Sequence, residues 1–318
     1  MTLFENDCRM KPSLSLIVST YNRSQQLLVT LRSIAAQTAP AAQWECVVVD
    51  NNSTDDTAVQ VEAFRAAHPD VPIRYLFEKR QGLSWARNCG ITGSAGRIIA
   101  IIDDDERIVP GFVSAYIDFF AAHPDVAAAG GAIIAEYPSG RPDWMSPYTE
   151  RPIANPIDLG PRPRPFPRGR IPGGGNMALQ RWAVERYGAF DPSLGRRGGV
   201  LLGGEECELF ERLARGGERC WYVPDAVMYH IIPPSKLSRD YFDRLCFNIG
   251  VSQRTRAAMR GGIGRMWCAE ALKWGATALL AAAYCLTGRG ARAVWLVRMR
   301  RRIAAGIRNG SQRKQAGT

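Results

Sequence analysis

Three consecutive aspartates, residues 103–105, follow directly after the apolar run IIAII at residues 98–102. An unbroken apolar run of this length predicts a strand that is buried on both faces of a parallel sheet. In open α/β sheets, ligands bind at the carboxyl ends of such strands. Because adjacent carboxylates repel one another, we expect a cation here, most simply a hard divalent metal with oxygen ligands. A solvated acidic turn is the alternative.

Two earlier segments also place polar residues where a predicted strand stops. The segment SLSLIVSTYNR, residues 13–23, is an apolar run with a polar turn, and a helical pattern follows it. The segment WECVVVDNNSTDDT, residues 44–57, repeats this arrangement and has Asp50 at the end of its strand. The amides at a helix N-terminus can receive a phosphate or the edge of a base. A lone aspartate after a strand is compatible with a structural cap, but two such turns favour a nucleotide pocket.

A glutamate pair and one histidine are further candidates for chemistry. Glu205 and Glu206 begin a helical pattern and directly follow two glycines, which leave room for a substrate. Acids in a first helical turn are also favoured by the helix dipole alone. His230 lies beyond the last predicted strand and before a double proline, so it could reach back toward the aspartates as a metal ligand. The other two histidines, His68 and His123, lie in matching AHPDV segments and indicate structural roles.

A proline-rich segment and a glycine run stand between these clusters. Residues 138–172 hold ten of the 20 prolines and six arginines. No regular element tolerates this proline density, so we expect a long loop that acts as a lid or contacts the substrate. A passive surface insertion is the alternative. The segment IPGGGNMAL, residues 171–179, contains three glycines in a row, which let the backbone approach a ligand closely.

The elements that must position these residues alternate between strand and helix. IRYLFE, residues 73–78, predicts a third strand, and residues 79–91 predict a tight turn and a helix. The alternation continues through residue 120 and favours an α/β fold with a doubly wound, mostly parallel sheet. No GxGxxG motif follows any predicted strand, so a dinucleotide-binding site of the Rossmann type is disfavoured.

The composition is that of a globular protein. The 318 residues are 46% hydrophobic and 22% charged, enough for a large core with an appendage. The eight cysteines show no CxxC pair and no regular spacing, so they indicate neither a zinc knuckle nor a disulfide framework. We therefore expect a reducing, cytosolic setting. The first ten residues carry two acids and do not resemble a secretory signal.

The net charge of +11 comes almost entirely from the C-terminal region. Glu270 is the last acidic residue and ten basic residues follow it, whereas residues 1–270 hold 31 basic and 30 acidic residues. Residues 237–259 predict a helix that leaves the main domain. The 14 uncharged residues 274–287 predict a helix of about 21 Å, too short to span the roughly 30 Å hydrocarbon core of a bilayer.

The last part of the chain, ARAVWLVRMRRRIAAGIR at residues 291–308, surrounds regularly spaced apolar residues with arginines. The apolar positions, four apart, are Trp295, Met299, Ile303 and Ile307. This pattern is typical of a basic amphipathic helix that lies in a lipid interface, so we expect contact with an anionic membrane surface. An ordinary docked helical hairpin is the alternative. No nucleic-acid partner is expected, because no binding motif accompanies the basic residues.

With these segments in place, the chain resembles the inverting nucleotide-sugar glycosyltransferases of family 2, which have the GT-A fold. The matching stretches, in family order across residues 13–235, are IVSTYNR, VVVDNNSTDDT, GLSWARNCGI, IIDDDE, GGGNMAL, GGEECELFERL and VPDAVMYH. Each stretch is weak evidence alone, but seven in order are specific. The resemblance implies a GT-A domain over residues 1–235 and leaves residues 236–318 as a separate helical region.

The resemblance also implies roles for single residues. Donor binding falls on Thr20, Tyr21, Asn22, Arg23, Asp50, Arg87, Asp103 and Asp104. A divalent ion, Mg²⁺ or Mn²⁺, would be held by Asp105 and His230, and the acceptor would lie near Gly174, Gly175 and Asn176.

One departure from the family pattern concerns the general base. The family usually has Glu-Asp where this chain has Glu205-Glu206, so Glu206 takes the place of the expected base with a side chain longer by one methylene. The change can move the carboxylate by about 1 Å, enough to alter acceptor placement. Glu205 is the other candidate.

The resemblance implies a UDP- or GDP-linked sugar donor and a saccharide or lipid-linked acceptor in cell-surface polysaccharide synthesis. With the basic tail, it predicts an enzyme on the cytoplasmic face of the cell membrane. A sugar-phosphate nucleotidyltransferase and a non-catalytic nucleotide-sugar-binding protein are the alternatives.

Overall fold

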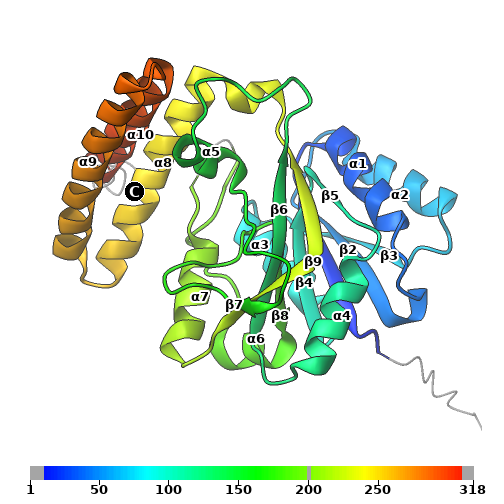
Figure 1. Ribbon diagram of the computed structural model, residues 1–318. Coiled ribbons are helices and arrows are strands. Elements are labelled where there is room, and N and C mark those ends of the chain that lie inside the picture. The colour runs from blue at the N-terminus through cyan, green and yellow to red at the C-terminus, as the bar shows by residue number, and fades with distance from the viewer. Residues whose placement is uncertain (1–10, 199–201, 310–318) are drawn as a thin grey trace, which may run out of the picture.

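The computed structural model describes residues 11–198 and 202–309. In this part of the chain, nine strands form one sheet with helices on both faces (Figure 1). The strands are β1 (Leu14–Thr20), β2 (Trp44–Asp50), β3 (Ile73–Phe77), β4 (Ile98–Asp103), β5 (Glu106–Ile108), β6 (Ala128–Glu136), β7 (Arg164–Pro165), β8 (Met177–Gln180) and β9 (Cys220–Ile231). The main helices are α1 (Ser24–Ala35), α2 (Thr57–Ala67), α3 (Leu83–Thr92), α4 (Phe112–Ala122), α5 (Pro147–Ala154), α6 (Arg181–Tyr187), α7 (Glu205–Arg215), α8 (Arg239–Met259), α9 (Ile263–Leu286) and α10 (Gly290–Asn309).

Both faces of the central strands are buried, as their continuous apolar runs predicted. Leu16 and Val18 of β1 point into a core that also holds side chains of α1, α2 and α4. Ile17, between them, points to the opposite face and packs with α3, α6 and α7. Side chains alternate along a strand, so a strand covered on both faces must be apolar throughout.

The order of the strands explains how the polar strand ends meet. The order is β3-β2-β1-β4-β8-β6-β9-β5, with β7 beside β9. The pairs from β3 to β4 are parallel, and their register places Thr20 opposite Asp50 and Ser19 opposite Asp103. The doubly wound α/β architecture is therefore confirmed. Beyond β4 the sheet is mixed, because β8 runs antiparallel to both β4 and β6.

The proline-rich segment 138–172 differs from its prediction, because it contains a helix. Ser146 and Thr149 form a reciprocal capping box at the start of α5, and Pro147 occupies its first turn. Proline is tolerated in a first turn because the amide it lacks has no partner inside the helix. The prediction rested on the number of prolines and not on the position that each one occupies in a helix.

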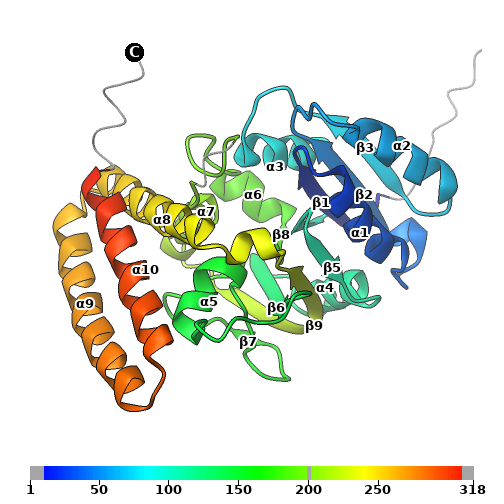
Figure 2. The same cartoon turned by 90° about the horizontal axis from the view of Figure 1, so that it is seen from above.

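The C-terminal region also differs from its prediction. Met299, Ile303 and Ile307 of α10 are buried in a cluster with side chains of α5 and α8, and Trp295 stacks on Trp144 with ring centroids 3.8 Å apart. The apolar side of α10 thus faces protein and not lipid, as in the docked-hairpin alternative, whereas membrane contact of the C-terminal region as a whole stays a prediction. α9 lies outermost, with α10 between it and α8 (Figure 2). Within residues 11–198 and 202–309, we find no helix with the length and hydropathy needed to cross a bilayer.

Candidate active site

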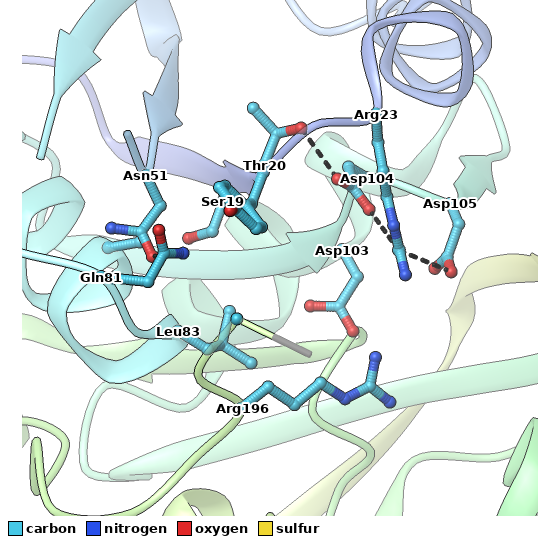
Figure 3. A pocket seen from close by; sticks show the side chains of 13 residues that line it. Ser19, Thr20, Arg23, Asn51, Gln81, Leu83, Asp103, Asp104, Asp105 and Arg196 are labelled. Carbon is cyan, nitrogen blue, oxygen red and sulfur yellow. Dashed lines mark hydrogen bonds and ion pairs between the residues drawn. The ribbon is translucent and has the colours of Figure 1, made fainter. Parts of the chain in front are cut away.

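A cleft opens at the carboxyl ends of β1, β2 and β4 (Figure 3). Of the predicted donor-binding and metal residues, its lining includes Thr20, Tyr21, Arg23, Asp103, Asp104 and Asp105. It also includes residues that the sequence analysis did not single out: Ser19, Asn51, Gln81, Leu83, Ala86, Arg196 and Gly198. The last two reach the cleft because the carbonyl of Arg196 accepts a hydrogen bond from the amide of Leu83, at the start of α3 (2.9 Å).

Asp104 is held between the end of β1 and the start of α1. Thr20 Oγ1 donates to Asp104 Oδ2 (2.8 Å), and Arg23 Nη1 donates to Asp104 Oδ1 (2.9 Å). Arg23 also lies 3.2 Å from Asp105 Oδ2. Burial raises the pKa of Asp104 to about 6, although Arg23 opposes this shift. Asp104 is therefore an internal member of the site, which fixes Arg23 at the mouth of the cleft.

Asp105 contacts two groups from the chain that follows β9. Lys236, in the short 3-10 helix η2 (Pro234–Leu237), donates from Nζ to Asp105 Oδ2 at 2.5 Å. His230 Nε2 lies 3.9 Å from Asp105 Oδ1, so the structure brings together the two predicted metal ligands. Burial would raise the pKa of Asp105, but Lys236, His230 and Arg23 outweigh it and hold that pKa below its ordinary range.

The acidic residues of this cluster fit a divalent ion. Carboxylate oxygens of Asp103, Asp105 and Glu106 lie within 4.8 Å of one another. Hard oxygen donors grouped in this way match the coordination of Mg²⁺ or Mn²⁺. Glu106 is the weakest candidate of the three, because its Oε2 accepts from the amide of Asp103 (2.8 Å) and burial raises its pKa well above the ordinary value. The stronger candidate ligands for a divalent ion are therefore Asp103, Asp105 and His230.

Arg87 connects this cluster to the glutamate pair. Its Nη2 donates to Asp103 Oδ1 (3.1 Å) and its Nη1 donates to Glu205 Oε1 (3.2 Å) and Glu206 Oε1 (3.1 Å). A further bond runs to the carbonyl of Gly174 (3.1 Å). The whole side chain of Arg87 is buried and does not line the cleft, so its predicted contact with the nucleotide stays a prediction. Arg87 aligns Asp103 on β4 with α7.

The two glutamates differ in exposure and in charge. Glu205 is buried, and its Oε2 has no hydrogen-bond partner among the described residues. Burial, followed by the charge of Glu206, raises the pKa of Glu205 to about 8. Burial also acts against the charge of Glu206, but Arg87 outweighs it and lowers the pKa of Glu206, whose side chain is 20% exposed. At neutral pH, Glu206 is ionised and reachable while Glu205 holds a proton.

The glycine run packs its backbone against these carboxylates. A Cβ atom at Gly174 would lie 1.9 Å from Glu206 Oε1, and one at Gly175 would lie 1.8 Å from Glu106 Oε1. Any other residue would displace the acids. The side chain of Asn176 is fully buried, and it is hydrogen-bonded to Tyr116, Ala132 and Ala226. Its predicted acceptor role stays a prediction.

Two predicted donor-binding residues support the cleft from behind. Asn22 Oδ1 accepts from the amide of Thr54 (2.7 Å), and Asp50 accepts from the amide of Ser53 (2.8 Å) and from the hydroxyl of Tyr75 (2.8 Å). Asn51, the next residue along the chain, lines the cleft in place of Asp50. The same strand end provides both residues, and the donor-binding role of Asp50 stays a prediction.

Comparisons with known proteins give four findings. The profile described as "Glycosyl transferase family 2" matches residues 15–188, more than half of the chain. The succinoglycan biosynthesis protein ExoM of Rhizobium meliloti is 28% identical over 260 residues, covering 79% of this chain and 77% of the relative. The glucosyl-dolichyl phosphate glucuronosyltransferase of Haloferax volcanii is 24% identical over 250 residues, 76% of each chain. The solved structure of a mannosyltransferase from Pyrobaculum calidifontis in complex with GDP-Man and Mn²⁺ has a TM-score of 0.64 at 20% identity, covering 96% of this chain and 88% of that one.

Proposed function

The chain belongs to glycosyltransferase family 2, as its motifs predicted, and on this premise we propose an inverting transfer of a sugar from a UDP- or GDP-linked donor to a hydroxyl group. For the acceptor we propose a saccharide or a lipid-linked saccharide of cell-surface polysaccharide synthesis. The names of two relatives support this class, since one belongs to succinoglycan biosynthesis and the other carries glucosyl-dolichyl phosphate in its name.

The observation that carries the proposal is the shared guanidinium of Arg87. It ties a base candidate, Glu206, to Asp103 at the mouth of the donor cleft. Glu206 would accept the proton of the acceptor hydroxyl as that oxygen attacks the anomeric carbon. Arg87 keeps Glu206 ionised and fixes its position, and the neutral carboxyl of Glu205 leaves a single base at this point. A single base and no second nucleophile suit direct displacement with inversion.

Asp105 and His230, with Asp103 beside them, are the residues that would hold Mg²⁺ or Mn²⁺. When bound, such an ion supplies Lewis-acid stabilisation of the departing nucleoside diphosphate. Arg23 contributes its own positive charge at the same edge of the cleft, 3.2 Å from Asp105.

A donor screen tests the reaction. UDP- and GDP-sugars are incubated with the full chain, Mn²⁺ and saccharide acceptors, and nucleoside diphosphate release is measured. We expect release with one donor class, and loss of most of it in Asp105→Asn, while Asp118→Asn on the exposed side of α4 stays active. Near-normal turnover of Asp105→Asn at saturating Mn²⁺ would contradict the metal assignment. Transfer of the nucleotide itself would contradict the reaction class.

We also propose that the enzyme works at an anionic membrane surface, on the cytoplasmic side, through α9 in place of α10. Leu272, Leu279 and Leu286 are 77%, 76% and 89% exposed and repeat every seven residues along one side of α9. Glu270 and Thr277 on the other side are buried. Apart from Lys273, the exposed residues between the leucines are small and uncharged, so the apolar face is wider than the seam of a two-helix coiled coil, and it lacks the paired opposite charges that would set a partner's register.

The charges around this face complement anionic lipid. Lys273 and Arg289 border the uncharged stretch 274–288, and the chain carries no acidic residue after Glu270. Each basic residue close to an anionic leaflet contributes about 1 kcal/mol. A helix docked by one side and apolar on the other can rest in the interface without crossing it.

Co-sedimentation with phosphatidylserine vesicles tests this surface. We expect the wild type to bind at low salt and the triple variant Leu272→Ser, Leu279→Ser, Leu286→Ser to lose binding, while Val59→Ser, an equally exposed apolar change on α2, binds normally. Unchanged binding of the triple variant would reject α9 as the contact. A wild-type dimer in analytical ultracentrifugation that the triple variant dissolves would identify a second copy as the occupant instead.

A further inference from the structure

Lys236 stands between the two side chains to which we assign the divalent ion. Its Nζ lies 2.5 Å from Asp105 Oδ2 and 3.3 Å from His230 Nε2, while those two partners approach each other to 3.9 Å at Asp105 Oδ1. The lysine is buried, with 6% of its surface exposed. It belongs to η2, which begins at Pro234 and is preceded by Pro233, so a stiff segment holds the ammonium at this point.

The position is specific for a cation. His230 Nδ1 lies 3.1 Å from the carbonyl of Ala154, which can only accept, so that nitrogen carries the hydrogen and Nε2 presents its lone pair to Lys236. Asp105 presents a carboxylate oxygen to the same ammonium. The atoms that hold Nζ are therefore the atoms that a divalent ion would use, at ligand distances of about 2.0–2.2 Å.

An ammonium and a divalent ion cannot share this space. Two cations held by the same carboxylate and the same imidazole would repel each other strongly in a buried setting. The ion must displace the lysine. Lys236 has somewhere to go: together with Arg23, Ser235 and Tyr241 it lines a cavity that adjoins the donor cleft and shares Arg23 and Asp105 with it.

Counting charges shows when the displacement is favourable. Without an ion, Asp104 and Asp105 balance Arg23 and Lys236, two carboxylates against two cations. A divalent ion alone leaves an excess of two positive charges in a partly buried site, which is unfavourable. The phosphates of a nucleoside-diphosphate donor remove this excess, because they give both the ion and the displaced ammonium an anionic partner.

We propose that Lys236 is a tethered cation that occupies the metal position in the free enzyme and moves to the donor's diphosphate when the ion enters. This rests on the proposed metal site. Lys236 makes the binding of ion and donor interdependent: the ion binds weakly alone and tightly with the nucleotide, and by linkage the nucleotide depends equally on the ion. Lys236 is thus a positioning and coupling residue.

The proposal is tested by titrating the full chain with Mn²⁺, with and without UDP or GDP. Electron paramagnetic resonance measures the concentration of free Mn²⁺. For the wild type we expect weak binding alone and at least tenfold tighter binding with the nucleotide. Lys236→Met and Lys236→Gln remove the charge, so they should bind Mn²⁺ alone at least tenfold more tightly than the wild type and lose most of the nucleotide effect. Lys236→Arg keeps a cation in place and should retain the weak binding.

Two controls separate the possible failures. Lys11→Met, an exposed lysine that precedes β1, should behave as the wild type, and circular dichroism checks the fold of every variant. If Asp105→Asn abolishes Mn²⁺ binding while both neutral Lys236 variants match the wild type, the lysine proposal is overturned and the metal site stands. If Asp105→Asn also leaves Mn²⁺ binding unchanged, the metal site and the lysine proposal fall together.

Discussion

The site contains two acidic clusters that differ in the number of cations facing their carboxyl groups. On the side of β1 and β9, Asp104 and Asp105 face two cations, Arg23 and Lys236. On the side of α7, Asp103, Glu205 and Glu206 share the single buried guanidinium of Arg87. Lys236, His230 and Arg23 hold the pKa of Asp105 low against the effect of burial, whereas burial, followed by the charge of Glu206, raises the pKa of Glu205 to about 8.

Because of this difference, the two clusters can take up a cation or a proton in different ways. A cluster with one cation for each carboxylate can trade one cation for another while its net charge stays near zero. A cluster with three carboxyl groups around one guanidinium can lower its charge only by taking up a proton. The first arrangement suits a diphosphate and an ion, and the second suits a general base beside a neutral acid.

Arg87→Met should produce the largest effect, because it removes the guanidinium that all three carboxyl groups of the second cluster contact. Ionised Glu206 and Asp103 would then lose their buried partner, and we expect the free energy of unfolding to fall by about 3–5 kcal/mol, with activity lost. Urea denaturation followed by circular dichroism measures this. Arg23→Met, a partly exposed arginine of the first cluster, is the matched control and should cost much less stability, because Lys236 still faces Asp105. Equal losses in the two variants would contradict the comparison.

Glu206→Gln should leave donor binding intact and lower kcat by about 10²-fold or more, the usual scale for loss of a general base. The amide is nearly isosteric and still accepts a hydrogen bond from Arg87, so the fold should survive. Initial rates at saturating donor, with the nucleotide Kd from calorimetry, separate the two effects. Glu185→Gln, on the exposed side of α6, controls for the loss of a charge. A fully active Glu206→Gln beside a dead Glu205→Gln would show that the other glutamate is the base.

Glu205→Gln should alter the pH dependence of stability. The pKa of Glu205 is about 8 in the folded protein and 4.5 as its ordinary value, so the folded state holds a proton that the unfolded state releases. The stability linked to this proton is complete below pH 4.5 and declines as the pH rises to 8. Thermal unfolding from pH 5 to 8 should show this decline in the wild type and a flatter profile in the variant. Parallel profiles would mean that Glu205 is ionised at neutral pH.

Thr20→Val should give the smallest effect, confined to the first cluster. It removes one hydrogen bond to Asp104 at nearly constant volume, while Arg23 keeps its own bond to that residue. We expect the donor KM to rise about fivefold, or about 1 kcal/mol, with kcat little changed. Steady-state kinetics measures this, and Thr54→Val, at an exposed turn, is the control. A loss as large as that of Glu206→Gln would place Thr20 in direct contact with the reacting groups.

The sheet and the carboxyl-edge cleft were predictable because they follow from local patterns. The apolar run before Asp103 predicts a strand covered on both faces, and β1 and β2 also end in polar residues. The parallel register then brings those ends together without further information. Glu206 and His230 could be singled out as candidates from their positions after a glycine pair and a strand, but the base role of Glu206 came only from the family motif.

The partners themselves could not be predicted from local sequence. Arg87 meets Glu205 and Glu206 across separations of 118 and 119 residues, and Lys236 meets Asp105 across 131. Nothing in the sequence near Lys236 distinguishes it from a solvated lysine. The α10 prediction failed for a related reason: an amphipathic pattern defines an apolar face but does not say whether protein or lipid covers it.

The insertion of β8 between β4 and β6 has a consequence for synthesis of the chain. β4 is complete at Asp103, but the neighbour that covers its second edge begins only at Met177. At translation rates of about 5–20 residues per second, the isoleucine-rich edge of β4 waits roughly 4–15 seconds for this partner. An unpaired apolar edge is a template for intermolecular pairing. The three aspartates that end the strand are therefore also gatekeepers, whose repulsion discourages nascent chains from pairing at this edge before the cleft exists.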